Sequence, residues 1–211
     1  AGEPEGRGPA EIEAARKLFA GPCTFVAGTA SLASLPASSL PEIAFAGRSN
    51  VGKSSLVNAL TGRNALARVS SKPGHTRQIN FFDLGGVLFL VDLPGYGFAQ
   101  VSRSMKETWQ DLASAYLRGR PTLKRVCLLI DCRHGVKEAD RETMKSLDAA
   151  AVSYQLVLTK VDRLKEAEIA RVVAESLGAR MVVARDDGGC AAGGSAAGGP
   201  LAGGSPAGGS A

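Results

Sequence analysis

The segment GRSNVGKS, residues 47–54, has the residue types and spacing of a loop that binds phosphate groups. It fits the pattern G-x-x-x-x-G-K-[ST], and it joins the apolar run EIAFAG to the helical pattern KSSLVNALTG. The glycines let backbone N–H groups converge on phosphate oxygens, and the N-terminus of the helix adds a favourable dipole. We therefore expect Lys53 to reach the β- and γ-phosphates of a nucleotide and the Ser54 hydroxyl to bind Mg²⁺. The alternative is a chance glycine-rich turn. Such a turn would not explain why the motif spacing occurs together with a preceding strand and a following helix.

The segment DLPG, residues 92–95, follows the apolar run VLFLV and supplies a second set of candidate groups. We expect Asp92 to approach the metal through a bound water and Gly95 to offer its backbone N–H to the γ-phosphate. In many GTP-hydrolysing switches the next residue is a glutamine that orients the attacking water, but here it is Tyr96. A phenol cannot do that from the same place, so we expect the Tyr96 hydroxyl to face a partner surface.

The segment TKVD, residues 159–162, follows the apolar run YQLVL and carries groups that can recognise a purine base. The Asp162 carboxylate can accept hydrogen bonds from N1–H and the exocyclic amine of guanine, and adenine has no such pair of donors. The stem of Lys160 can lie along the plane of the base. T-K-x-D is common on protein surfaces, but its order and position after the phosphate loop favour a guanine-binding role.

A metal-binding hydroxyl is expected between the first two motifs, where it would bind Mg²⁺ when the γ-phosphate is present. The threonines in this interval are Thr61 and Thr76. Thr61 ends the first helical pattern and cannot reach the site, whereas Thr76 lies in the polar loop SSKPGHTRQ, which can order around GTP and release after hydrolysis. Its neighbours His75 and Arg77 are expected to face a partner or solvent rather than to bind metal.

Apolar runs that alternate with helical patterns predict an α/β fold with a mostly parallel sheet and helices on both faces. Gly85-Gly86 between two of the runs predicts a hairpin, which places one antiparallel strand at an edge. The expected strands are EIAFAG, INFFDL, VLFLVDL, RVCLLID, YQLVLTK and RMVVA, and the expected helices are KSSLVNALTG, MKETWQDLASAYLRG, EADRETMKSLDAA and KEAEIARVVAESLG.

The chain divides into three parts by composition. Residues 1–40 combine a short amphipathic helix, EIEAARKLFA, with a Ser/Pro-rich linker. Residues 41–185 hold the motifs and form the nucleotide-binding domain. Residues 186–211 repeat GGxxx with a period of five, and we expect a disordered coil there because almost nothing apolar can be buried.

Composition limits the cellular setting. The 211 residues suit one domain with extensions, and they contain no apolar run of 18 or more that could span a membrane. Cys23, Cys127, Cys132 and Cys190 include no C-x-x-C pair, so we expect reduced thiols and a cytoplasmic protein without a metal cluster.

The charge of the chain is basic, at +5 overall. Asp186 and Asp187 are the only charged residues of the tail, so residues 1–185 hold all 25 basic residues and 18 of the 20 acidic ones, a net charge of +7. Either a polyanionic partner or a merely soluble basic surface explains this excess. The basic candidates near the second motif and the helix after it are Arg103, Lys106, Arg118, Arg120, Lys124 and Arg125.

Five segments together resemble the EngB (YihA/YsxC) family of bacterial GTPases, in the translation-factor-related class near the Era-like GTPases. They are GRSNVGKSS, KPGHTRQINFF, DLPGYGFAQVS, LIDCRHGVKEAD and LTKVD, and the resemblance covers residues 15–180. It implies a P-loop GTPase fold and a cytoplasmic, monomeric, Mg²⁺-dependent GTPase that hydrolyses GTP to GDP slowly. It further implies a switch in late assembly of the large ribosomal subunit, with that subunit and its rRNA as partners, and a link to cell division and septation.

Relatives that lack the water-orienting glutamine suggest a role for Asn50. Several carry an asparagine at this position that helps to hold K⁺ beside the phosphates, where the ion neutralises developing charge. Asn50 with K⁺ is therefore a candidate for the missing catalytic help, and a purely structural role in bracing the loop is the alternative.

The candidate site can now be stated in full. Lys53, Thr76 and Asn50 are the expected catalytic residues, Ser54 and Thr76 the expected Mg²⁺ ligands with Asp92 acting through water, and Asn50 the K⁺ ligand. The residues expected to bind GTP are Gly47, Arg48, Ser49, Asn50, Val51, Gly52, Lys53, Ser54, Ser55, Gly74, His75, Thr76, Arg77, Gln78, Asp92, Leu93, Pro94, Gly95, Thr159, Lys160, Val161 and Asp162.

The C-terminal part departs from the family pattern. RMVVA matches the last strand, but residues 185–188 lack the Ser–Ser or Ser–Ala pair of the guanine-contacting loop, and the GGxxx repeat cannot form the final helix. One alternative is therefore a GTPase-fold binding module with impaired nucleotide binding. Another is a tRNA-modification or transport GTPase, which the lack of a second folded domain disfavours.

Overall fold

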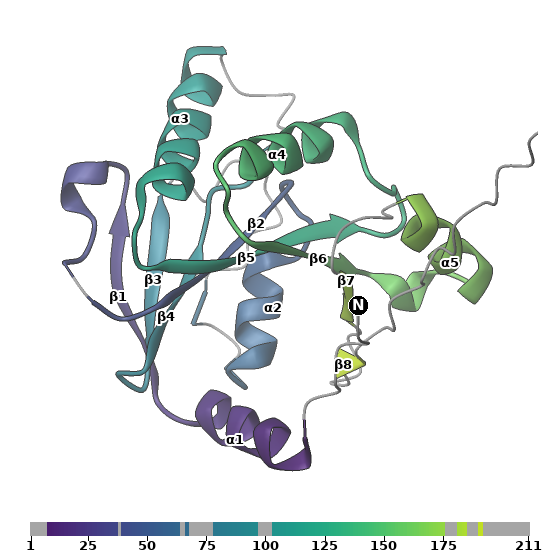
Figure 1. The fold of residues 1–211 in the computed structure, drawn as a ribbon, viewed down its shortest axis with the longest axis horizontal. Coiled ribbons are helices and arrows are strands. Elements are labelled where there is room, and N and C mark those ends of the chain that lie inside the picture. Colours follow the sequence, from purple (N-terminus) through teal and green to yellow (C-terminus); the bar gives the residue numbers. More distant parts are fainter. Residues whose placement is uncertain are drawn as a thin grey trace, which may run out of the picture.

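The computed structural model of the chain describes residues 8–37, 39–63, 66–67, 78–96, 103–175, 181–184 and 190–191. At residues 103–110 and 175, and from residue 181 on, it describes the backbone alone. In this part of the chain the strands form one sheet, with helices on both of its faces (Figure 1). The expected α/β architecture is therefore confirmed.

The sheet contains eight described strands in the order β1-β3-β4-β2-β5-β6-β7-β8. Strands β2, β4, β5, β6 and β7 run parallel to one another, and the pairs β1–β3, β3–β4 and β7–β8 are antiparallel. The bounds are β1 (Cys23–Thr29), β2 (Glu42–Gly47), β3 (Ile79–Leu84), β4 (Leu88–Asp92), β5 (Leu123–Asp131), β6 (Tyr154–Thr159), β7 (Met181–Ala184) and β8 (Cys190–Ala191).

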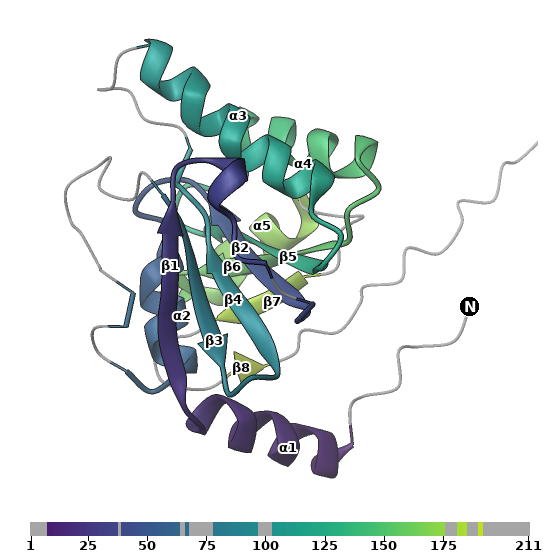
Figure 2. The same ribbon diagram turned by 90° about the vertical axis from the view of Figure 1, so that its left-hand side faces the viewer.

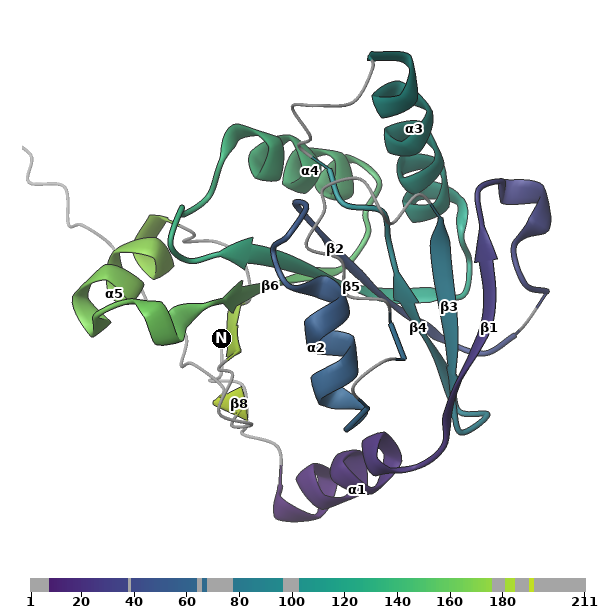
Figure 3. The same cartoon turned by 180° about the vertical axis from the view of Figure 1, so that it is seen from behind.

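The helices match the expected patterns and divide between the two faces. Helices α1 (Pro9–Ala20) and α2 (Lys53–Leu60) lie on one face (Figure 3), and α3 (Arg103–Gly119), α4 (Glu138–Ala149) and α5 (Glu166–Glu175) pack on the other (Figure 2). Short 3₁₀ helices span Leu32–Ser34 and Val161–Arg163. Within the described residues, no helix is long and apolar enough to cross a membrane.

The antiparallel part of the sheet is larger than the sequence indicates, and one expectation needs correction. Strand β3 is antiparallel to β4, as the hairpin predicts, but it does not form the edge. The edge strand is β1, which comes from the segment assigned to a helix and linker and pairs antiparallel with β3. Its burial pattern does not alternate, and Phe25 is 55% exposed, so the segment carries no clear strand period. In the tail expected to be a disordered coil, Cys190–Ala191 form β8, and the other tail residues lie outside the described ones, so the expected absence of a final helix stays a prediction.

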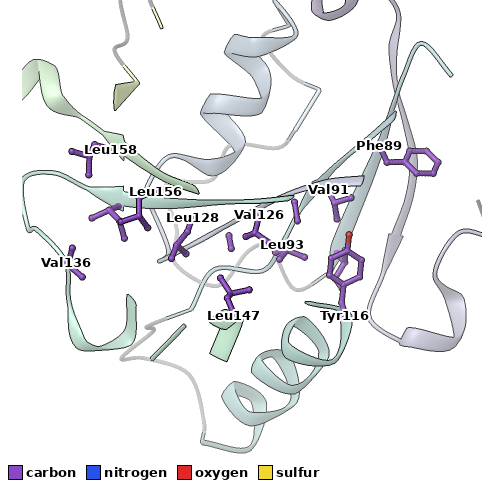
Figure 4. Packing of buried hydrophobic residues seen from close by; sticks show 14 of the residues in the cluster. Phe89, Val91, Leu93, Tyr116, Val126, Leu128, Val136, Leu147, Leu156 and Leu158 are labelled. Carbon is purple, nitrogen blue, oxygen red and sulfur yellow. The ribbon is translucent and has the colours of Figure 1, made fainter. Parts of the chain in front are cut away.

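Two apolar clusters hold the layers together. The larger one joins α3, α4 and α5 to the sheet, and Figure 4 shows Tyr116 of α3 and Leu147 of α4 pointing toward the strands. The smaller one contains Val57 of α2 with Phe45 and Leu90 of the sheet, and Phe19 of α1 packs against it. By packing helices against both faces, these two clusters hold the strands whose carboxyl ends carry the site.

A buried ionic group fixes the C-terminal end of α3 against the start of β2. Glu42 is fully buried and accepts hydrogen bonds from Tyr116 at 2.6 Å, Thr122 at 2.8 Å and Arg120 at 2.7 Å. Arg120 also donates to the carbonyl oxygen of Pro36 at 2.8 Å, and its side chain is 14% exposed. Arg120 is therefore occupied by contacts inside the fold, which corrects its place among the basic residues expected to meet a partner.

Candidate functional site

The predicted motifs meet at one edge of the sheet. Strands β2, β4, β5 and β6 run parallel, so their carboxyl ends lie side by side. The phosphate loop follows β2, DLPG begins at the end of β4, and TKVD begins at the end of β6. The crevice outside the carboxyl ends of parallel strands is where ligands bind in open α/β sheets.

The phosphate loop turns away from β2 at Gly47, where no larger residue fits. Gly47 has a φ of 150°, and a Cβ atom there would lie 2.8 Å from the carbonyl oxygen of Leu129 in β5. At its other end the loop enters α2 at Gly52, and no side chain caps this helix. The first N–H groups of α2 are therefore available to phosphate oxygens rather than to a protein side chain.

The Lys53 amine lies inside the loop. It donates hydrogen bonds to the carbonyl oxygens of Gly47 at 3.0 Å and Arg48 at 3.2 Å. The residue is 7% exposed, and burial lowers the pKa of its amine, an effect that the nearby Asp92 carboxylate opposes. Because water is largely excluded, the positive charge acts strongly on any anion that enters the loop.

Ser54 and Asp92 form a pair that fits a bound metal. The Ser54 hydroxyl donates to Asp92 Oδ2 at 2.9 Å, whereas Asp92 Oδ1 is buried without a hydrogen-bond partner in the described part of the chain. Burial raises the pKa of Asp92, and Lys53 and the Ser54 hydrogen bond act in the opposite direction. A buried carboxylate oxygen without a donor is costly. A Mg²⁺-bound water beside Ser54 would supply that donor, so these residues fit the metal expected from the sequence.

The DLPG segment lies directly against the phosphate loop. Ser49 N–H donates to the Tyr96 carbonyl oxygen at 3.0 Å, and Tyr96 N–H donates to the Gly47 carbonyl oxygen at 3.4 Å. A Cβ atom on Gly95 would lie 2.7 Å from Ser49 Oγ and 3.0 Å from both its Cα and its backbone nitrogen. Only glycine allows this approach without a shift of one of the two loops.

The Tyr96 side chain does not face a partner surface, so that expectation is wrong. Its hydroxyl donates to Asp140 Oδ1 in α4 at 2.8 Å, and its ring packs against the larger apolar cluster. Burial, with Asp140 as the next largest cause, raises the pKa of the phenol far above its usual range. The neutral hydroxyl is therefore held as a donor inside the protein.

TKVD is attached to the phosphate loop by two side chains. Thr159 Oγ1 donates to the Val51 carbonyl oxygen at 2.7 Å, and the Lys160 amine donates to the carbonyl oxygen of Asn50. Lys160 also bonds Asp131 Oδ2, at 2.9 Å, at the end of β5. These contacts fix the distance between the groups that would meet the phosphates and those that would meet the base.

Asp162 is open to a ligand. Its side chain is 38% exposed, and one carboxylate oxygen lies 3.2 Å from Arg163 Nε. The other carboxylate oxygen can accept a hydrogen bond from a base without the loss of this contact. The arrangement is compatible with the expected contact to guanine.

The switch residues Gly74, His75, Thr76 and Arg77 lie outside the described residues, so the Thr76 ligand stays a prediction. Gln78 begins the approach to β3, and its side-chain oxygen lies 2.7 Å from where a Cβ atom on Gly28 of β1 would be. Asn50 is exposed at the tip of the loop with a φ of 59°. The other predicted residues lie on the loops already described: Arg48 and Ser49 are half-buried, Val51, Leu93, Pro94 and Val161 are buried, and Ser55 is exposed on α2.

Two carboxylates near the site were not predicted. Asp131 accepts hydrogen bonds from Lys160 and Arg133, and although its burial acts the other way, these two cations hold its pKa below the usual range. The signal was available, because Asp131 ends an apolar strand as Asp92 does. Asp140 ends the segment LIDCRHGVKEAD that carries the family resemblance, but it lies in a polar helix, and its contact with Tyr96 is tertiary and could not be predicted.

Comparison with known proteins decides the family. The family described as 50S ribosome-binding GTPase matches residues 42–160, more than half of the chain. A probable GTP-binding protein EngB of Rhodospirillum rubrum is 60% identical over 185 residues, which span 83% of this chain and 79% of that protein. The chain belongs to the EngB family of GTP-binding proteins. An EngB protein of Caulobacter vibrioides is also 60% identical, over 166 residues that span 79% of this chain and 72% of its own length.

Solved structures agree with an EngB fold. A crystal structure of a probable GTP-binding protein EngB has a TM-score of 0.55 and 24% identity, and it covers 67% of this chain and 87% of its own. Aquifex aeolicus Era bound to GDP·AlF₄⁻ has a TM-score of 0.56 and 20% identity, with 68% and 51% covered. At such low identities the likeness concerns the fold alone, and it confirms the P-loop GTPase fold expected from the sequence.

Replacement Gly95→Ala should weaken binding of a GTP analogue by about tenfold or more, the scale of losing a hydrogen bond to a charged group. The added methyl group would collide with Ser49 and push the Gly95 N–H away from the phosphate loop. The measurement is calorimetric titration with a non-hydrolysable GTP analogue. Gly119→Ala, at the end of α3 where a Cβ atom meets nothing within 4 Å, is the control. Equal affinities of the two variants would contradict the close contact.

Proposed function

We propose that this EngB-family chain is a Mg²⁺-dependent GTPase with a slow intrinsic rate that acts as a switch in late assembly of the large ribosomal subunit. The observation that carries the proposal is the contact of buried Lys53 and Asp92 with half-buried Ser54 beside the uncapped N-terminus of α2. A buried cation, a hydroxyl and a carboxylate oxygen without a partner among the described residues together suit a metal–triphosphate complex.

Each residue has a role in the conversion of GTP and water to GDP and phosphate. When bound, Mg²⁺ would neutralise negative charge on the phosphates. Ser54 and Thr76 would bind the metal directly and Asp92 through a water, while Lys53 holds the phosphate oxygens. Gly95 N–H orients the γ-phosphate, and Asp162 selects guanine. The slow rate follows from Tyr96, which stands in place of a water-orienting glutamine and whose hydroxyl is bonded to Asp140.

The ribosomal role is supported by charge and by the family. The matching family is described as binding the 50S ribosomal subunit, and the chain carries a net charge of +5. Among the basic candidates with described side chains, Arg118 and Lys124 are exposed and available to phosphate groups of rRNA. Action in the cytoplasm and a link to cell division and septation are part of the same proposal, by resemblance to the family.

Asn50 is proposed to hold K⁺ beside the phosphates, where the ion would neutralise charge that develops in the transition state. Its position at the exposed tip of the phosphate loop supports this role. Exchange of K⁺ for Na⁺ at equal ionic strength should slow hydrolysis with little change in GTP affinity, and Asn50→Ala should remove the difference. A parent rate that is the same in both salts, free and ribosome-bound, would contradict a K⁺ site.

Replacement Ser54→Ala should remove most Mg²⁺-dependent turnover, with a loss of about tenfold or more, since a direct ligand of the metal disappears. Lys53→Ala should have a similar effect through loss of the phosphate-binding charge. Phosphate release is measured with and without Mg²⁺, and nucleotide binding is measured by titration. Ser153→Ala, at an exposed position directly before β6 and away from the carboxyl ends of the strands, is the matched control and should turn over normally. Normal turnover by Ser54→Ala would rule out the metal assignment.

Replacement Asp162→Asn should weaken GTP binding by about 1–3 kcal/mol, the scale of leaving a hydrogen-bond partner unsatisfied. It should also improve binding of xanthosine triphosphate, which carries an acceptor where guanine has its amine. Competition titrations with both nucleotides measure the change in preference. Asp111→Asn, an exposed carboxylate on α3, controls for the change in charge. An undiminished preference for GTP in Asp162→Asn would show that TKVD does not read the base.

Co-sedimentation with large ribosomal subunits tests the proposed partner. Binding should be stronger with a non-hydrolysable GTP analogue than with GDP, and it should weaken as the salt concentration rises. The double variant Arg118→Ala/Lys124→Ala should reduce the slope of log affinity against log salt by about one to two. Arg16→Ala/Lys17→Ala, on α1, serves as the control for net charge. Equal binding in both nucleotide states would argue against a switch.

A further inference from the structure

Tyr96 lies at a junction of three parts of the molecule. Its backbone pairs with the phosphate loop on both sides, through Ser49 N–H at 3.0 Å and the Gly47 carbonyl oxygen at 3.4 Å. Its side chain reaches α4, where the hydroxyl donates to Asp140 Oδ1 at 2.8 Å. The residue therefore connects the segment that follows β4 to the phosphate loop and also to α4, which lies on the other face of the sheet from α2.

The Asp140 end of this contact is rigid. Asp140 is 1% exposed, and its second carboxylate oxygen accepts the Lys137 N–H at 2.9 Å, which caps the start of α4. Asp140 Oδ2 thus accepts the hydrogen bond that caps the helix, and Oδ1 accepts the one from Tyr96. If Tyr96 moved away, a buried carboxylate oxygen would lose its donor, and that loss is costly.

The consequence concerns Gly95, the residue before Tyr96. Gly95 approaches Ser49 so closely that even a methyl group would collide with it. Because Tyr96 is held on both sides, the backbone at Gly95 cannot withdraw from the phosphate loop unless the bond to Asp140 breaks or the phosphate-loop pairing opens.

We propose that Tyr96 is a positioning residue whose bond to Asp140 holds the Gly95 N–H where it meets the γ-phosphate, and that this contact sets the preference for GTP over GDP. The inference rests on the proposed function, since it assumes that Gly95 contacts the γ-phosphate. The tyrosine then replaces the usual glutamine but has a different role, because it fixes the backbone instead of orienting the water.

The test compares two affinities in each variant, because a general loss of stability lowers both affinities together. Titrations with GDP and with a non-hydrolysable GTP analogue, both with Mg²⁺, give the ratio of the two dissociation constants. Tyr96→Phe retains the buried ring and removes the hydroxyl, and it should reduce the preference for the analogue by about three- to tenfold, the effect of one lost hydrogen bond. Asp140→Ala should reduce the preference at least as much, because the Tyr96 hydroxyl then loses the carboxylate that accepts its hydrogen bond.

Tyr116→Phe is the matched control. Its hydroxyl also donates to a buried carboxylate, Glu42 Oε2, at 2.6 Å. Glu42, however, is the first residue of β2, whereas the phosphate loop begins at the last residue of that strand. This variant should lower the melting temperature and leave the nucleotide preference within about twofold of the parent, because it removes a hydrogen bond far from the site. In the double variant Tyr96→Phe/Asp140→Ala, the loss of preference should be no larger than in the more affected single variant, because both changes remove the same bond.

The outcomes separate this inference from the proposed function. The positioning role alone would be overturned if the parent prefers the GTP analogue and Tyr96→Phe retains this preference. A thermal unfolding curve must show that the variant is folded. Additive losses in the double variant would overturn it as well. A parent that binds neither nucleotide would overturn the proposed function and this inference with it.

Discussion

The burial of the Lys53 amine is the constraint on which the site depends. A cation removed from water needs acceptors, and Lys53 finds them in two carbonyl oxygens of its own loop and in the nearby Asp92. These contacts shape the loop around the amine and leave one Asp92 oxygen without a donor among the described residues. The protein thus holds a buried positive charge next to an unsatisfied carboxylate, an arrangement that a metal–polyphosphate complex would complete.

The sheet explains how this arrangement can be held in place. Four parallel strands end at the same edge, and each brings one polar segment to it. Short contacts then connect the segments: Tyr96 and Ser49 join the end of β4 to the phosphate loop, and Thr159 and Lys160 join β6 to it. The two apolar layers keep the strands in register, so the groups that would meet the ligand are positioned before it arrives.

Tyr96 occupies the position after DLPG, where many GTP-hydrolysing switches have a glutamine, and its side chain has a different role. In a glutamine-containing switch the side chain at this position acts on water, but here it is directed into the protein and bonded to Asp140. The described residues place the hydroxyl at α4, so a water-orienting group has to come from elsewhere.

Local patterns in the sequence predicted most elements and the segments that meet at the candidate site, whereas the tertiary structure alone decided which distant groups become partners. The spacing of Gly47, Gly52, Lys53 and Ser54 predicted the phosphate loop, because glycine at fixed positions and apolar periodicity act on the nearby backbone. Strand β1, by contrast, exists because β3 offers its free edge, and Arg120 and Tyr96 turn inward because Glu42 and Asp140 are placed beside them. Residue type cannot tell a solvated arginine or tyrosine from a buried one. That distinction depends on whether packing removes water from the group and supplies a hydrogen-bond partner in its place.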